Sequence, residues 1–176
     1  FEDKIFIDPR NLISKDAEII FVSDLFVEDY VGGAELTSEA LINESPYKIQ
    51  KIRSKDVSLA TLKQGHDKFW IFGNFSQMNP ELIPTIVGNM KYAIVEYDYK
   101  YCKYRSPEKH QHVEGKICDC HNQINGKIIS AFYYGSSFIF WMSEKQKSRY
   151  QVLFPFLLEK SSFVISSISQ KRLLEK

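Results

Sequence analysis

The sequence predicts an α/β fold, in which a Rossmann-like, doubly wound and mostly parallel sheet of about six strands carries helices on both faces. Short apolar runs suited to buried strands alternate with helical patterns almost throughout the chain. Such alternation is typical of parallel strands joined by right-handed helical crossovers. A length of 176 residues suffices for one full core but not for two large ones. We therefore expect a single domain over residues 1–176.

The first strand and helix have the clearest pattern. Residues 18–26 form an apolar run, and a glycine pair, Gly32 and Gly33, precedes an apolar-periodic stretch that ends at Ile42. A helix that begins on glycines leaves backbone N–H groups open to an approaching ligand, with the positive end of the helix dipole behind them. No third glycine follows, so this is not the dinucleotide fingerprint. A tight turn with no ligand role remains the alternative interpretation.

The remaining elements continue the alternation. Asn79 and Pro80 are suited to open a helix, as a capping residue followed by a proline at the first helical position. Residues 97–125 show weak periodicity and are expected to form an irregular insert. The expected strands are residues 47–53, 68–73, 92–96, 137–141 and 162–167, and the expected helices are residues 59–63, 79–90, 126–135 and 143–154.

Polar side chains follow the ends of these strands, where ligands bind in open α/β sheets. Hydroxyls, amides, carboxylates and aromatic rings together suit a polyhydroxylated ligand. For Ser143 and Glu144 the alternative is an ordinary helix start, with a hydroxyl cap and an acidic first turn. For Asp98 it is an exposed loop carboxylate. The residues at the strand ends are Asp24, Asn74, Ser76, Glu96, Tyr97, Asp98, Tyr99, Ser143, Glu144, Ser166, Ser167 and Ser169.

The insert also gathers thiol and imidazole groups, the residue types that zinc selects. Cys118 and Cys120 are closer in sequence than the usual ligand pair, and no second thiol pair follows. We therefore expect no metal, with buried cysteines packing as small hydrophobic residues and histidines facing water. No partnered base points to a cysteine nucleophile. The group comprises Cys102, His110, His112, Cys118, Cys120 and His121.

Composition bounds the function classes. A formal net charge of +1 gives no electrostatic argument for binding nucleic acid or an anionic membrane. No run approaches the roughly 18 apolar residues of a membrane span. An odd count of three cysteines argues for a reducing compartment, so we expect a cytoplasmic location.

Two parts of the chain carry a family resemblance. The segment 19–24 with Gly32-Gly33-Ala34-Glu35, and the later segments 141–155 and 164–167, resemble the N-terminal domain of retaining glycosyltransferases of the two-Rossmann-domain (GT-B) architecture, the "group 1" or family four class. The resemblance covers nearly the whole chain in order, and the glycine loop is its sharp motif. Residues 26–30 lack the prolines common in that family.

The resemblance implies a function. The chain would be the acceptor-side half of a longer, hexosyltransferase-type enzyme, inactive without its C-terminal domain. That enzyme would move a sugar from a nucleotide-sugar donor to a hydroxyl acceptor, with no metal or other cofactor. Gly32 and Gly33 would lie near the donor diphosphate or the acceptor, and Glu35 would fix the loop. The acceptor side would include Asn74, Asp98 and Tyr99.

Two other functions fit the same residues. One is a stand-alone nucleotide- or phosphosugar-binding module that uses the glycine loop without transfer. The other is a non-catalytic interaction domain, whose Cys/His insert binds a partner or zinc. The sequence leaves open the sugar, the acceptor, the stereochemical outcome, the catalytic residues, the oligomeric state and whether the Cys/His group binds a metal.

Overall fold

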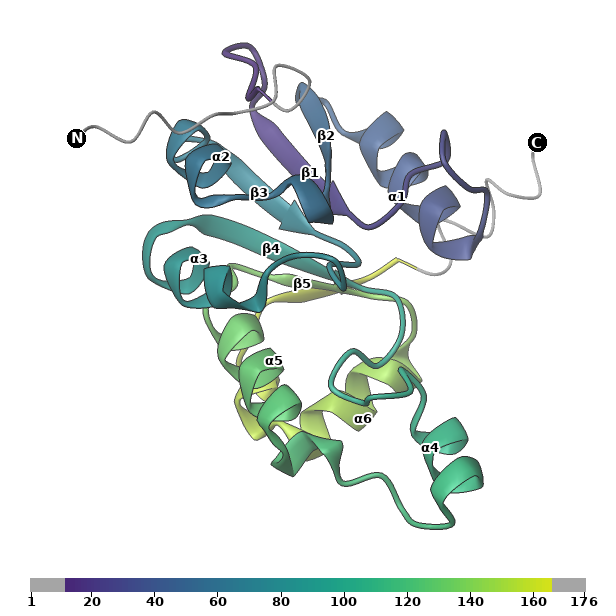
Figure 1. Cartoon of the computed structure of the whole chain (residues 1–176). Helices are drawn as coiled ribbons and strands as arrows, with labels where there is room; N and C mark the ends of the chain where they lie inside the picture. The colour runs from purple at the N-terminus through teal and green to yellow at the C-terminus, as the bar shows by residue number, and fades with distance from the viewer. Residues whose placement is uncertain (1–11, 166–176) are drawn as a thin grey trace. The chain divides into compact units, whose positions relative to one another are not determined.

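The computed structural model describes residues 12–165, which form an all-parallel, six-stranded sheet with helices on both faces (Figure 1). This confirms the predicted three-layer, Rossmann-like fold. The strand order is β2-β1-β3-β4-β5-β6. The strands are β1 (Ile19–Ser23), β2 (Ile49–Arg53), β3 (Phe69–Phe72), β4 (Lys91–Glu96), β5 (Ile139–Trp141) and β6 (Ser162–Val164).

The helices connect these strands. The α-helices are α1 (Gly33–Glu44), α2 (Leu59–Gln64), α3 (Ile83–Asn89), α4 (Pro107–Glu114), α5 (Ile124–Tyr134) and α6 (Glu144–Leu153). Short 3₁₀ turns also occur within the described part of the chain: η2 (Ser54–Asp56), η3 (Pro80–Leu82), η4 (Cys120–Asn122) and η5 (Pro155–Leu158).

Most predicted elements lie where the pattern puts them, with shifts of a few residues at their ends. The helix expected over 79–90 is divided into η3 and α3, and Asn79 does cap its start, its side chain accepting a hydrogen bond from the Glu81 amide. The insert 97–125 contains α4, which no pattern predicted. Ser166, Ser167 and Ser169 lie outside the described residues.

The chain divides into two compact units, residues 1–92 and 93–176. In the first, β1 lies between β2 and β3, with Ile19 paired in register with Ile49 on one side and with Phe69 on the other. A strand paired on both edges and covered on both faces must be apolar throughout. Residues 20–22 accordingly have no exposed surface.

The second unit is built around β4 and β5 and has a strongly aromatic core. Tyr150 is fully buried and lies 4.8 Å from the Trp141 ring and 5.9 Å from the Tyr133 ring, centroid to centroid. A buried tyrosine hydroxyl needs a hydrogen-bond partner. For Tyr133 and Tyr150, one carboxylate meets that requirement, because both hydroxyls donate to Glu96.

None of the helices formed by residues 12–165 combines the length and the apolar character that a membrane crossing requires.

Candidate functional site

The chain reverses its direction of winding at β1. It passes from β1 to β2 on one side and then returns to place β3 on the other side. In open α/β sheets, ligands bind outside the carboxyl ends of the strands at such a switch point. The loop from β1 to Gly32 and the loop from β3 through Asn74 and Ser76 begin at these two strand ends.

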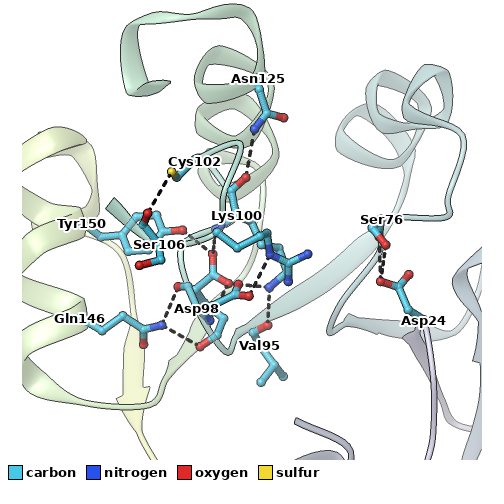
Figure 2. A network of polar contacts seen from close by, with 12 residues as sticks. Asp24, Ser76, Val95, Asp98, Lys100, Cys102, Ser106, Asn125, Gln146 and Tyr150 are labelled. Carbon is cyan, nitrogen blue, oxygen red and sulfur yellow. Dashed lines mark hydrogen bonds and ion pairs between the residues drawn. The ribbon is translucent and has the colours of Figure 1, made fainter. Parts of the chain in front are cut away.

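Asp24 joins the loops at this edge. Its Oδ2 accepts hydrogen bonds from the Ser76 hydroxyl at 2.6 Å and the Ser76 amide at 3.1 Å, and its Oδ1 accepts from the Ser54 hydroxyl (Figure 2 shows the Ser76 pair). Burial disfavours the charged carboxylate, but these hydrogen bonds outweigh burial and lower the pKa of Asp24. Asp24 and Ser76 therefore hold the ends of β1, β2 and β3 together.

The loop before the glycines is anchored on β2 by ion pairs. Lys51 Nζ lies 2.7 Å from Glu28 Oε1 and 2.7 Å from Glu39 Oε2, and Arg53 pairs with Asp29. An Asp29 oxygen also accepts the Phe26 amide at 3.1 Å. The alternating cations of β2 thus fix the path that leads to α1.

Helix α1 begins as the sequence predicts, on Gly32 and Gly33. Gly32 is its extended N-cap, and no side chain described in the structure caps it. A Cβ at Gly32 would lie 2.6 Å from Glu35 Oε2 and 2.7 Å from the Tyr30 ring, whereas one at Gly33 would meet nothing within 4 Å. A side chain at position 32 would displace the side chains of Glu35 and Tyr30, and the Glu35 carboxylate lies against the turn. Gly33 is exposed, and its surroundings are open.

In the second unit, Asp98 follows the end of β4. Its Oδ2 pairs with Arg105 Nε at 2.9 Å, and its buried Oδ1 has no hydrogen-bond partner among the described residues. Burial and the Glu96 charge raise the pKa of Asp98, against the opposing effects of Lys100 and Arg105. Arg105 has a φ of 62°, a left-handed conformation that is uncommon outside glycine and that clusters at functional sites.

Ser143 and Glu144 start α6. The Ser143 hydroxyl accepts the Gln146 amide at 3.1 Å, so it caps the helix as the alternative interpretation holds, and Glu144 is exposed in the first turn. The Gln146 side chain donates to the carbonyls of Glu96 at 3.1 Å and Asp98 at 2.8 Å (Figure 2). The structure thus brings the start of α6 to the turn that carries Asp98.

Tyr99 belongs to the same turn, and packing explains its position. Its ring stacks on Tyr150 at 5.8 Å with an interplanar angle of 12°. The Arg149 guanidinium lies 4.6 Å from the centre of the Tyr99 ring and donates to its hydroxyl at 3.3 Å. Tyr99 is half-buried.

The Cys/His insert brings four of its six candidate ligands together. The ligand atoms of Cys102, His110, Cys118 and Cys120, which we call the Cys₃His cluster, all lie within 4.8 Å of one another. Cys118 is half-buried, the other three are buried, and none of the cysteines is in a disulfide. Burial and hydrogen bonding with the neighbouring thiols raise the pKa of Cys118 to about 12. Helix α4 carries His110 to the three thiols, a proximity that the short spacing of Cys118 and Cys120 does not predict.

A surface hollow of about 350 Å³ lies elsewhere in the second unit, beside α5 and η5. Tyr134, Phe154 and Phe156 contribute to its wall. None of the substrate-binding residues predicted from the sequence lines it.

Comparison with known proteins adds no assignment. No protein-family model matches the sequence, and no curated protein is similar enough to count as a relative.

Proposed function

We propose that the chain is the acceptor-side domain of a two-domain, GT-B-type glycosyltransferase, which moves a sugar from a nucleotide-sugar to a hydroxyl acceptor. The observation that carries the proposal is the position of the glycine-led helix α1, which directly follows β1 at the β1/β3 switch point. The step from fold to activity is one of analogy with the family that the sequence resembles.

The charges at this turn favour one class of ligand. Gly33 is exposed at the positive end of α1, and the Glu35 carboxylate lies beside Gly32. Backbone N–H groups donate to hydroxyl oxygens, and a carboxylate accepts hydroxyl protons but repels a phosphate. A neutral, polyhydroxylated acceptor therefore fits the turn better than the diphosphate of the donor. Of the two ligands that the resemblance offers, we assign the acceptor to Gly32 and Gly33.

Asp98 is the candidate carboxylate of the second unit. One of its oxygens is held by Arg105, while the other is buried without a hydrogen-bond partner in the described structure. A raised pKa makes a carboxylate a better proton acceptor, as a general base requires. We propose that Asp98 accepts a proton from a hydroxyl group of a ligand bound within the second unit.

Glycosyl transfer by the native full-length protein, assayed with a panel of nucleotide-sugar donors and hydroxyl acceptors, tests the proposal. In the variant Gly33→Asp, the new side chain enters open space at a helix N-terminus, where an acidic residue is favourable. The fold should persist, while kcat/KM for the acceptor falls about tenfold or more. Gly88→Ala is the matched control, because it too enters open space but lies in α3.

Two results would contradict the proposal. One is the absence of transfer and of donor hydrolysis with every donor in the panel. The other is tight binding of a nucleoside diphosphate by this chain alone, lost in Gly33→Asp, without transfer by the native protein. The second result would favour the stand-alone nucleotide-binding module.

A further inference from the structure

We propose that the Cys₃His cluster binds one structural zinc ion, which holds the insert 97–125 in place. Cys102 comes from the loop after β4, His110 from α4, Cys118 from the segment that follows α4, and Cys120 from η4. Three thiols and one imidazole are a ligand set of structural zinc sites. This inference does not depend on the proposed transferase function.

The distances within the cluster match those of a tetrahedral zinc site. Zn–S bonds of about 2.3 Å and Zn–N bonds of about 2.0–2.1 Å place sulfur and nitrogen about 3.6 Å apart and two sulfurs about 3.8 Å apart. Nδ1 of His110 lies 3.7 Å from Cys102 Sγ and 3.4 Å from Cys120 Sγ. All four ligand atoms lie within 4.8 Å of one another. Zinc binding would therefore shorten the distance between any two of them by about 1 Å at most.

The histidine is oriented as zinc ligands are. Nδ1 of His110 faces the thiols, and its Nε2 lies 2.9 Å from Glu114 Oε2, one helical turn further along α4. A carboxylate on the far nitrogen of a ligating histidine fixes the ring and raises its basicity. Glu114 is itself held by the Tyr104 hydroxyl at 3.1 Å and by an ion pair with Lys103. The carboxylate that would orient His110 is therefore itself fixed in position.

Residues 103–119 of the insert bury little apolar surface. Between residues 103 and 119, His110 is the one buried residue, and the side chains of Val113 and Ile117 are 56% and 80% exposed. A segment that buries so little apolar surface cannot offset the entropy of ordering its chain. Metal binding supplies that free energy in small zinc-bound elements. The low burial of residues 103–119 and the distances between the four ligand atoms therefore both support a bound zinc ion.

The ligand set also indicates the role of the ion. Four protein ligands complete a tetrahedron, so no position is left for water or substrate, as in structural rather than catalytic zinc sites. Tetrahedral sites rich in thiolate are typical of zinc or iron–sulfur centres. The single histidine, with its carboxylate partner, favours zinc.

The test is elemental analysis of the chain purified in its native state, together with cobalt replacement. We expect one zinc per chain, and a cobalt form whose visible spectrum shows tetrahedral, thiolate-rich coordination. His110→Ala should weaken zinc binding by more than about 100-fold, because losing a ligand costs more than losing a hydrogen-bond partner of a ligand, which costs up to about 100-fold. His112→Ala is the matched control, because His112 lies on the same helix, is exposed, and lies outside the cluster.

If His110→Ala fails to fold, limited proteolysis of the wild-type chain with and without zinc tests the same proposal. Removal of zinc with a chelator should open residues 103–119 to proteolysis, and added zinc should restore protection. A chain that neither contains nor takes up zinc would overturn the proposal. So would equal losses of zinc in His110→Ala and His112→Ala, or bound iron and sulfide in place of zinc.

Discussion

Glu96 and Lys100 form an ion pair inside the second unit, with Glu96 Oε1 2.6 Å from Lys100 Nζ and side chains 0% and 4% exposed. The hydroxyls of Tyr133 and Tyr150 both donate to the other carboxylate oxygen, and Lys100 Nζ also donates to the Val95 carbonyl at 3.2 Å (Figure 2 shows Val95, Lys100 and Tyr150). A buried charge pair is tolerated only when its remaining hydrogen-bonding capacity is used, as it is here. Glu96 thus belongs to the core, although it stands at a strand end.

Lys100→Met should destabilise the protein by about 3–5 kcal/mol, because it leaves the Glu96 carboxylate buried without a counter-charge. Urea unfolding measures the loss. The control is Glu108→Gln, which removes an exposed pair with Arg149 and should cost no more than about 1 kcal/mol. Equal losses of stability in the two variants would contradict this prediction, because removal of Lys100 would then leave no costly buried charge on Glu96.

Asp24→Asn should cost about 1–3 kcal/mol near neutral pH, because part of the hydrogen bonding at the β1 edge is lost. The pKa of Asp24 is lower in the folded state than the ordinary value of 3.8. Its contribution to stability is therefore full above pH 3.8 and is lost as the pH falls through the folded pKa. The difference between variant and wild type, measured by urea unfolding across this range, should shrink towards acid. A constant difference would contradict this assignment.

The sequence could predict most of the fold because its strands and most of its helices are apolar in a regular pattern. The three central residues of β1 are fully buried, which an apolar run alone indicates. Helix α4 escaped prediction because its one buried residue is His110, so it has no apolar period to detect. A helix that is held by polar or metal contacts has no apolar periodicity in its sequence.

The candidate site was less predictable, because its geometry depends on residues far apart in the chain. Ser143 could be interpreted as a ligand contact or as a cap, and only the Gln146 contacts decide that it caps α6. The Cys₃His cluster was set aside on ligand spacing, which does not anticipate that α4 brings His110 back to the thiols. The density of cysteine and histidine in a stretch without apolar period was the available signal.

Gly126→Ala should destabilise the second unit by about 1–3 kcal/mol through overpacking. A Cβ at Gly126 would lie 2.3 Å from the Cys120 carbonyl oxygen and 2.5 Å from the His121 Cα, and backbone atoms cannot rotate away. Thermal unfolding measures the change. Gly88→Ala, whose methyl group enters open space in α3, should instead stabilise by up to about 1 kcal/mol. Loss of stability in both would point to backbone flexibility as the cause.

Glu114→Ala should weaken zinc binding by about 10–100-fold, since a metal-ligating histidine that loses its carboxylate partner is less basic and less well oriented. Glu114→Gln should fall between this variant and wild type, because an amide oxygen still accepts from His110 Nε2 but carries no charge. Competition with a chromophoric chelator measures both affinities.

The zinc-free forms separate positioning from folding. The Glu114 side chain is partly exposed, so wild type, Glu114→Ala and Glu114→Gln should unfold at similar temperatures without zinc, and should diverge more strongly when zinc is added. Glu108→Ala, on the same helix but away from the cluster, should match wild type in zinc affinity. If Glu114→Ala binds zinc as tightly as wild type, Glu114 does not position His110, and its contact with the ring is incidental to the metal.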